Sequence, residues 1–213
     1  MGRRALGKWD KTLDLSSHLV LWDDLPSIWS QRPMFDVSQP LEVEIGTGKG
    51  LFLKNAAIAV PERNFLGIEI SRKYARFSAA KLAVNDLKNA CVVHADGQRV
   101  FCEKIPADAL VAVHIYFPDP WWKKRHHKRR IMTESFVGEI ARTLKPRGRL
   151  HFWTDVAEVF QNALEVLANE SALSGPEEVD PQEVEHDLDY RTHFERRMRL
   201  SGVEIHRAEF IKK

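Results

Sequence analysis

The chain has 213 residues, of which 44% are hydrophobic and 29% are charged, and its formal net charge is +2. That composition is typical of one globular domain with a substantial core. The longest apolar stretch, residues 110–117, is too short to cross a bilayer, and the N-terminus lacks a signal-peptide core, so we expect a soluble cytoplasmic protein. Cys91 and Cys102 are not spaced like a metal clip or a redox pair, and we predict no metal site.

Residues 1–40 show no clear alternation, and we interpret them as an N-terminal extension packed on a core domain spanning residues 41–213. From Leu41 onward short apolar runs alternate with longer amphipathic stretches, the pattern of βαβ units that feed a mostly parallel sheet. Strands are predicted at residues 41–45, 64–70, 91–94, 109–117 and 149–154, with a turn at 145–148. Helices are predicted at residues 51–60, 72–84, 132–144, 156–169 and about 191–197.

An acidic segment and a single histidine carry weaker signals. The acidic segment from Glu177 to Asp189 contains no Lys or Arg and is predicted to be a solvated loop. His114 lies inside the fourth predicted strand, where we expect a hydrogen-bonded core histidine. Neither the acidic segment nor the histidine indicates an activity by itself.

Three glycines follow the first predicted strand directly. Gly46, Gly48 and Gly50 lack a Cβ, so the backbone can turn tightly and approach a ligand. The spacing disagrees with the usual phosphate-binding motifs: a dinucleotide fingerprint needs a glycine at Leu51, and a Walker loop needs Ser or Thr after Lys49. A purely structural turn remains an alternative for the glycines alone.

Acidic residues lie at the ends of the first three predicted strands. Glu44, Glu69 and Asp96 therefore fall at the carboxyl edge of the sheet, where open α/β folds bind ligands. Three carboxylates repel a pyrophosphate but suit S-adenosylmethionine, which has cationic groups and a ribose diol. Glu69 lies about 20 residues after the glycines, where an acidic side chain accepts hydrogen bonds from ribose hydroxyls. For each acid taken singly, a strand-end residue satisfied by solvent or a helix N-terminus is the favoured explanation. For the three acids together with the glycines, ligand binding is favoured.

A fourth acid, Asp119, follows the fourth predicted strand between two prolines that fix its backbone. Trp121 and Trp122 come next, and six of the eight residues from Lys123 to Arg130 are cationic. This arrangement offers charges to phosphates and indoles to bases, as in RNA-binding surfaces. For the charged residues, the alternative to RNA binding is the solvated start of a basic helix. For the two indoles, the alternative is burial in the core.

Together these motifs resemble the tRNA (guanine-N7)-methyltransferases. The matching segments run in order through residues 44–50, 67–69, 117–130, 154–155 and 192–195. The resemblance implies an α/β class I S-adenosylmethionine-dependent methyltransferase (Rossmann-like) fold, with a mostly parallel seven-stranded sheet and helices on both faces. It also implies S-adenosylmethionine as methyl donor and N7 of a guanine in the tRNA variable loop, position 46, as acceptor.

The same resemblance implies roles for individual residues. Asp119 is implied to be catalytic, and the implied donor-binding residues are Glu44, Gly46, Gly48, Gly50, Glu69, Asp96 and Asp119. The implied tRNA-binding residues are Lys123, Arg125, His126, Lys128, Arg129, Arg130, Asp155, Thr192, His193, Phe194 and Glu195. Two positions depart from the family pattern, because His193 replaces a frequent Lys and Trp122 a frequent His. For Thr192 and Glu195, the residues alone favour capping of a helix as much as binding of tRNA.

Two other functions fit part of the pattern. A class I methyltransferase with another substrate would use the same donor crevice, although the basic run argues against a small substrate. A non-catalytic tRNA-binding scaffold would use the same basic run, although the crevice acids argue against it. The resemblance implies that no obligatory protein partner is needed, and the choice between monomer and homodimer stays open.

Overall fold

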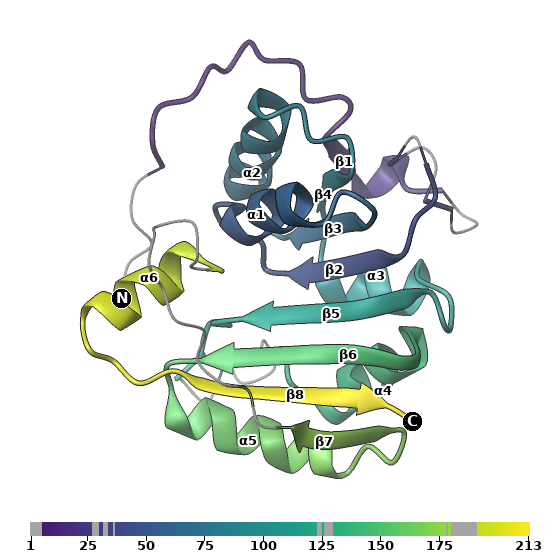
Figure 1. Ribbon diagram of the computed structural model, residues 1–213, viewed down its shortest axis with the longest axis vertical. Coiled ribbons are helices and arrows are strands. Elements are labelled where there is room, and N and C mark those ends of the chain that lie inside the picture. Colours follow the sequence, from purple (N-terminus) through teal and green to yellow (C-terminus); the bar gives the residue numbers. More distant parts are fainter. Residues whose placement is uncertain are drawn as a thin grey trace.

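The computed structural model describes residues 6–26, 30–31, 34–35, 37–122, 125, 130–177, 179 and 191–213. Within this part the chain forms an eight-stranded sheet of order β1-β4-β3-β2-β5-β6-β8-β7 (Figure 1). The strands are β1 (Leu19–Leu21), β2 (Leu41–Ile45), β3 (Asn64–Glu69), β4 (Ala90–His94), β5 (Leu110–Tyr116), β6 (Leu144–Thr154), β7 (Leu173–Glu177) and β8 (His206–Lys212). The sheet is mostly parallel, and β8 runs antiparallel to β6 and β7.

Helices cover both faces of this sheet (Figure 1). They are η1 (Trp22–Asp24), α1 (Leu51–Ala59), α2 (Arg72–Val84), α3 (Gly97–Glu103), α4 (Glu134–Thr143), α5 (Ala157–Ala168) and α6 (His193–Leu200). Buried residues of α3, α4 and α5 share one hydrophobic cluster with the strands, whereas α1 and α2 pack into a second cluster on the opposite face. A sheet covered in this way has strands that are buried on both sides.

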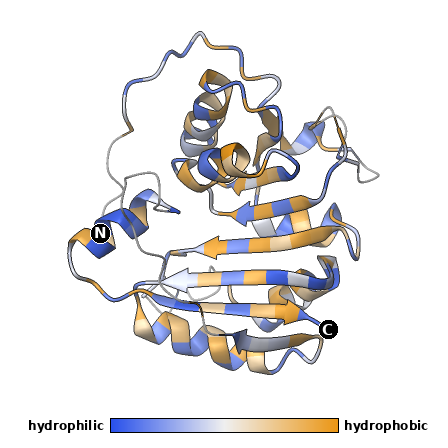
Figure 2. Cartoon of the chain, viewed as in Figure 1, coloured by the Kyte–Doolittle hydropathy of each residue, from blue (hydrophilic) through white to orange (hydrophobic). Residues whose placement is uncertain are grey.

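The alternation of side chains in β2 decides which residues face the candidate site. Leu41, Val43 and Ile45 belong to the larger cluster, so Glu42 and Glu44 point to the opposite face. Figure 2 shows the resulting alternation of hydrophobic and hydrophilic positions along β2. Two carboxyl groups are therefore placed inside the protein by strand geometry, and both are less than a tenth exposed.

The predicted α/β class, the mostly parallel sheet and the helices on both faces are confirmed. The predicted count of seven strands is wrong, because β1 adds an eighth strand that pairs in parallel with β4. Its three residues are too few to show an alternation that reveals a strand from sequence. The residue pattern also missed α3, β7 and β8 as local elements.

Two local predictions need correction. The turn predicted at residues 145–148 lies within β6 as an irregularity, where the register against β5 shifts and Arg147 has a φ of 66°. The acidic loop predicted from Glu177 onward begins in a strand, because Glu177 is the last residue of β7. The remainder of that prediction, apart from Val179, lies outside the described residues.

Cys91 is fully buried, and Cys102 is exposed. Burial raises the pKa of the Cys91 thiol to about 12. Among the described helices, none is long and apolar enough to cross a membrane.

Gly50 is a position where the fold requires glycine. Its φ is 65°, and a Cβ built there would lie 2.0 Å from Ser78 Oγ on the neighbouring helix α2. We predict that Gly50→Ala lowers the free energy of unfolding by about 2–4 kcal/mol, because left-handed strain and overpacking add. Urea denaturation measures the effect. Gly7→Ala is the control, since nothing lies within 4 Å of its Cβ. A loss for Gly50→Ala as small as that of the control would contradict the argument.

Candidate active site

The loop after β2 turns sharply through its three glycines. Gly46, Gly48 and Gly50 have φ angles of 81°, 56° and 65°, a region that side chains disfavour. The Gly46 amide donates to the Ile68 carbonyl at 2.8 Å, which fastens the loop to the end of β3. The tight turn expected from the sequence is present, and it brings the loop beside the second acidic residue.

Glu69 ends β3 and is already engaged by backbone amides. Its two carboxylate oxygens accept hydrogen bonds from the amides of Gly48 at 2.9 Å and Ser71 at 2.8 Å. Glu69 therefore ties the glycine loop to the start of α2. Each carboxylate oxygen can accept a further hydrogen bond, so this anchoring is compatible with a ligand hydroxyl.

Glu44 differs from Glu69 because one of its carboxyl oxygens is buried without a hydrogen-bond partner in the described part of the chain. Its residue is 3% exposed, and its Oε2 atom has no hydrogen-bond partner among the described residues. Burial raises the pKa of Glu44 well above its ordinary value, and the nearby charge of Glu69 raises it further. A buried acceptor without a partner is costly, and a cationic or hydrogen-bonding ligand would remove that cost.

Asp96 follows β4 and caps α3. Its side chain accepts hydrogen bonds from the amides of Gln98 at 2.8 Å and Arg99 at 3.4 Å. Asp96 is exposed, and it lies at the carboxyl edge of the sheet because it follows the end of β4. The predicted donor-site acids thus all lie where neighbouring parallel strands end.

The Pro-Asp-Pro turn after β5 holds Asp119 at the surface between two unusual residues. Phe117 and Trp121 have φ angles of 50° and 46°, which are rare for aromatic residues. The Phe117 amide donates to the Trp153 carbonyl of β6 at 2.8 Å, so the turn is fixed from the sheet side. A small hollow of about 30 Å³ between this turn and α5 is lined in part by Asp119 and Arg130. Strain held in this way is common at functional sites.

Helix α6 packs against the same turn, although about 75 residues separate them in sequence. The rings of Phe194 and Phe117 lie 4.9 Å apart, so Phe194 packs against the turn. Thr192 accepts a hydrogen bond from the Glu195 amide at 2.9 Å, and Glu195 accepts one from the Arg191 amide at 2.7 Å. The structure therefore gives Thr192 and Glu195 the reciprocal contacts of a helix cap.

Asp155 follows β6, the strand next to β5, and is half-buried. The preceding residue, Thr154, is fully buried and accepts a hydrogen bond from the Val156 amide at 3.2 Å. Asp155 and Asp119 therefore follow adjacent strands at one edge of the sheet.

Only part of the basic run is described. Arg125 is exposed, and Arg130 is half-buried, with its Nε donating to the Pro120 carbonyl at 3.3 Å. Trp122 is 61% exposed, so it is not buried in the core. Lys123, His126, Lys128 and Arg129, together with Lys124 and His127, lie outside the described residues.

A buried polar network lies on the same face of the sheet as Glu44. His114 contacts Glu42 through Nε2 at 2.7 Å and Tyr116 through Nδ1 at 2.9 Å, and the Arg191 guanidinium donates to the Tyr116 hydroxyl at 2.9 Å. Burial lowers the pKa of His114 to about 4, so the imidazole is neutral at pH 7. Glu42 also contacts Arg63 and stays ionised, with a pKa of about 2, because His114 and Arg63 hydrogen-bond to it despite burial.

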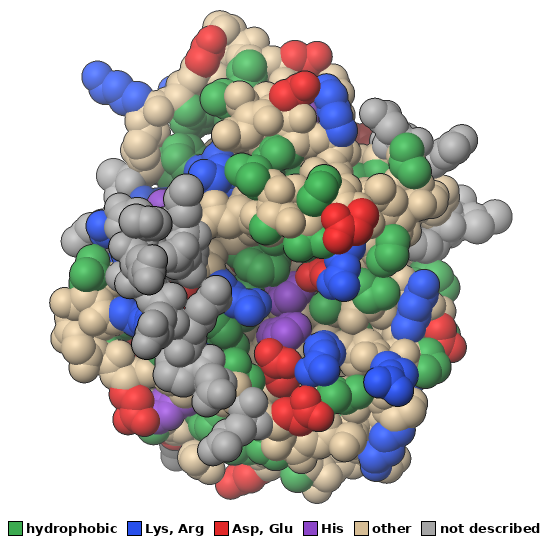
Figure 3. All heavy atoms as spheres, in the orientation of Figure 1, with side chains coloured by type: hydrophobic (Ala, Val, Ile, Leu, Met, Phe, Trp, Pro, Cys, Tyr) green, Lys and Arg blue, Asp and Glu red, His purple; other side chains and the backbone are tan. Residues whose placement is uncertain are grey.

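This network confirms the predicted role of His114 as a satisfied core histidine. It also reveals contacts that the sequence motifs did not include, because Arg191 and Tyr116 join α6 to the strand that carries the Asp119 turn. Figure 3 shows imidazole side chains among acidic and basic groups at the centre of the face viewed there.

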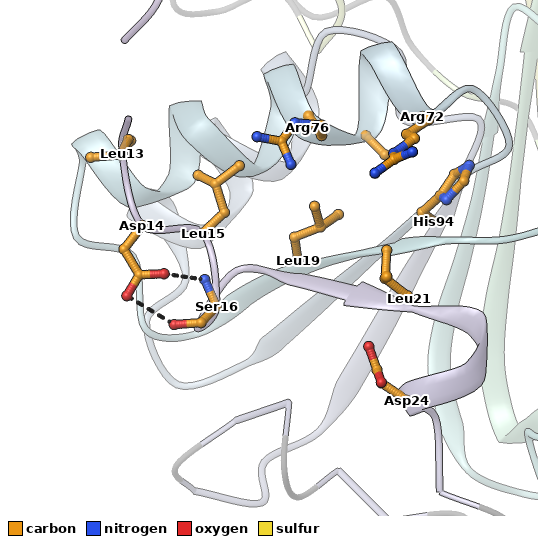
Figure 4. Close-up of a pocket in the computed structure, with 11 residues that line it drawn as sticks. Leu13, Asp14, Leu15, Ser16, Leu19, Leu21, Asp24, Arg72, Arg76 and His94 are labelled. Atoms are coloured by element: carbon orange, nitrogen blue, oxygen red, sulfur yellow. Dashed lines mark hydrogen bonds between the residues drawn. The ribbon is translucent and has the colours of Figure 1, made fainter. Parts of the chain in front are cut away.

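A larger hollow of about 340 Å³ lies outside the crevice, between the N-terminal segment and α2 (Figure 4). Leu15, Leu19 and Leu21 line it, and Arg72 and Arg76 reach into it from α2. Asp14, Asp24 and His94 add further charged or titratable groups. This mixed lining favours no single class of ligand, so the candidate active site remains the carboxyl edge of the sheet where the four acids lie.

Comparison with known proteins gives a consistent result. Residues 38–208 match the model of a family described as "Putative methyltransferase". A tRNA (guanine-N(7)-)-methyltransferase of Rhodopirellula baltica is 42% identical over 100% of this chain and 81% of its own length. One from Legionella pneumophila strain Corby is 36% identical over 89% of this chain and 85% of its own length. The chain belongs to the tRNA (guanine-N7)-methyltransferase family.

More distant methyltransferases share the fold of this family member. The 16S rRNA methyltransferase KamB superimposes with a TM-score of 0.59, covering 85% of this chain and 90% of that chain at 17% identity. Similarity at that level shows the fold alone. It agrees with the class I methyltransferase architecture predicted from the motifs.

The His114 network predicts a pH dependence of stability. The ordinary pKa of histidine, 6.5, falls to about 4 in the folded protein, so the unfolded state binds more protons between these values. We predict that acidification from pH 6.5 to 5 destabilises the wild type relative to His114→Gln by up to about 1.4 kcal/mol per pH unit. Urea unfolding at several pH values measures the difference. Parallel pH profiles for the two proteins would contradict the assignment of a neutral buried imidazole.

Proposed function

We propose that this protein transfers a methyl group from S-adenosylmethionine to N7 of a guanine in tRNA, at position 46 of the variable loop. The observation that carries the proposal is the buried Oε2 atom of Glu44, which has no hydrogen-bond partner among the described residues and lies beside a glycine loop, at the sheet edge that also carries Asp119. Relatives that align with most or all of the chain are named for the same reaction.

The crevice residues fit this donor. Glu44 lacks a hydrogen-bond partner for Oε2, which an ammonium group would supply, and the glycine loop leaves the backbone open to a close ligand. Glu69 and Asp96 keep acceptor capacity beyond their backbone contacts, which suits ribose hydroxyls and polar base edges. We therefore assign the donor to Glu44, Gly46, Gly48, Gly50, Glu69 and Asp96, with Asp119 at its reactive end.

The reaction needs alignment more than proton removal. When bound, S-adenosylmethionine supplies a methyl carbon that the guanine N7 lone pair attacks, so that the N–C bond forms as the C–S bond breaks and positive charge passes from sulfur to the guanine ring. The Asp119 carboxylate accepts hydrogen bonds from the guanine N1–H and amino group, which selects guanine. Its negative charge also stabilises the ring as the ring becomes cationic.

The substrate side of the site combines charges with an aromatic surface. Lys123, Arg125, His126, Lys128, Arg129 and Arg130 contact phosphates of tRNA in this proposal, and exposed Trp122 stacks on a base. Asp155 and residues 192–195 complete the substrate site at the neighbouring strand end and helix. We propose that the protein acts in the cytoplasm, in keeping with a tRNA substrate, and that it needs no obligatory protein partner.

Methyl transfer from labelled S-adenosylmethionine to unmodified tRNA, followed by nucleoside digestion, tests this function directly. We expect label in 7-methylguanosine, and its loss when the guanine at position 46 is replaced. Label in another nucleoside would favour a methyltransferase with a different target. Binding of tRNA without donor binding or label would favour the non-catalytic scaffold.

Asp119→Asn tests the proposed catalytic residue. The amide keeps the size of the side chain but loses the negative charge that stabilises the cationic guanine, so we predict a fall in kcat of about 10²- to 10³-fold. Donor affinity should change little by comparison. Single-turnover methylation and calorimetric donor binding measure the two effects. Asp23→Asn, an exposed acid outside the crevice, serves as control, and full activity of Asp119→Asn would refute the role.

The basic run is best tested as a set. We predict that Arg125, Lys128 and Arg129 changed together to Ala weaken tRNA binding and reduce the slope of log K against log salt by about 2–3, since each lost phosphate contact removes about one unit. Filter binding at several salt concentrations measures the slope. Lys145→Ala with Arg147→Ala is the matched control, because these exposed cations lie near the start of β6, away from the crevice. Equal slopes for both variants and wild type would exclude the assignment.

A further inference from the structure

Lys81 occupies a position that no sequence motif indicated. It lies in α2, half-buried, and its Nζ donates to the Lys49 carbonyl of the glycine loop at 2.6 Å. The same Nζ lies 3.3 Å from Nε2 of His193 at the start of α6. One ammonium group thus contacts both the loop proposed to hold the donor and the helix proposed to hold the substrate.

The charge at this point belongs to Lys81 and not to His193. Loss of hydration and the positive charge of Lys81 lower the pKa of His193 to about 4, so its imidazole is neutral at pH 7. Burial and the neighbouring Lys54 and Lys49 lower the pKa of Lys81 to about 8, which leaves it mostly protonated at pH 7. The histidine can accept a hydrogen bond from Lys81 but adds no cation of its own.

Glu44 lies on β2, the strand that leads into the glycine loop, and Lys81 contacts that loop at the Lys49 carbonyl. The positive charge of Lys81 counteracts the rise in the pKa of Glu44 that burial and Glu69 cause. The described contacts include no ion pair between them, and Glu44 Oε2 has no hydrogen-bond partner. Two of the three Lys81 N–H groups have partners, at Lys49 and His193, so a third can still donate. A buried carboxyl and a nearby ammonium therefore each retain capacity for a ligand.

We propose that Lys81 binds the carboxylate of the donor's amino-acid tail, while Glu44 binds the ammonium of the same tail. The inference rests on the proposed donor, whose tail is an α-amino acid that carries both charges on adjacent atoms. A carboxyl group and an ammonium group that form no ion pair with each other are complementary to such a tail. The Lys49 carbonyl holds the Lys81 ammonium at the glycine loop, so the contact is partly preorganised.

An RNA phosphate is the competing ligand for Lys81. The ammonium is half-buried against the glycine loop that follows Glu44, whereas the described cation Arg125 of the basic run is exposed. A phosphate at Lys81 would approach Glu44 without compensating it, but an amino-acid tail compensates both charges. The position therefore favours the donor tail.

The test compares three ligands by calorimetry: S-adenosylmethionine, its decarboxylated form, which keeps the ammonium, and 5′-methylthioadenosine, which lacks the whole tail. We expect Lys81→Met to weaken S-adenosylmethionine about 10- to 100-fold, the effect of removing one charge-assisted hydrogen bond. The other two ligands should bind Lys81→Met as they bind the wild type. Lys81→Arg should recover part of the loss, and Lys73→Met, an exposed lysine on the same helix, should lose nothing.

Glu44→Gln supplies the complementary measurement. It should weaken S-adenosylmethionine and the decarboxylated form alike and leave 5′-methylthioadenosine unchanged. An equal loss of all three ligands in Lys81→Met, or an unchanged affinity for S-adenosylmethionine with a raised KM for tRNA, would overturn the inference while the donor assignment survives. Failure of the wild type to bind S-adenosylmethionine would instead overturn the proposed function, and the inference with it.

Discussion

The parallel register of β2 with β3 and β5 is the constraint on which the site depends. Ile45 pairs with Ile68 on one side and with Ile115 on the other, so the three strands end together. The glycine loop, the end of β3 and the turn after β5 must then lie at one edge of the sheet. Backbone hydrogen bonds from Gly46 to Ile68 and from Phe117 to Trp153 carry this alignment into the loops themselves. The acids of the candidate site lie at one edge of the sheet because the strands that carry them end there together.

Two buried carboxyl groups on β2 differ in whether other groups of the protein compensate them, and this difference separates a structural residue from a functional one. Glu42 and Glu44 lie on the same face of one strand, and both are buried. Glu42 is compensated by Arg63 and His114 and stays ionised, whereas Glu44 lacks a partner for Oε2 and has a raised pKa. Uncompensated burial costs stability, and such costs are typical of sites that complete their hydrogen bonds with a ligand.

Helix α6 shows that structural and substrate roles can be combined in one motif. The capping contacts of Thr192 and Glu195 define the start of the helix, and Phe194 fixes it against the Asp119 turn through Phe117. Arg191 adds a hydrogen bond to Tyr116 at the end of β5. These contacts orient the helix relative to the turn, so the substrate-binding role proposed for residues 192–195 depends on the same geometry that caps the helix.

The sequence by itself determined the fold class, the glycine turn, and the placement of Glu44, Glu69, Asp96 and Asp119 at strand ends, because alternation and turn residues are local signals. It did not determine β1, α3, β7 or β8 as elements, since short strands and helices carry little periodicity. Only the tertiary structure decided that Glu44 Oε2 has no hydrogen-bond partner among the described residues, that Arg191 meets Tyr116, and that Lys81 joins the glycine loop to His193. Those facts depend on contacts between residues far apart in the chain, and packing of α2 and α6 against the sheet creates them.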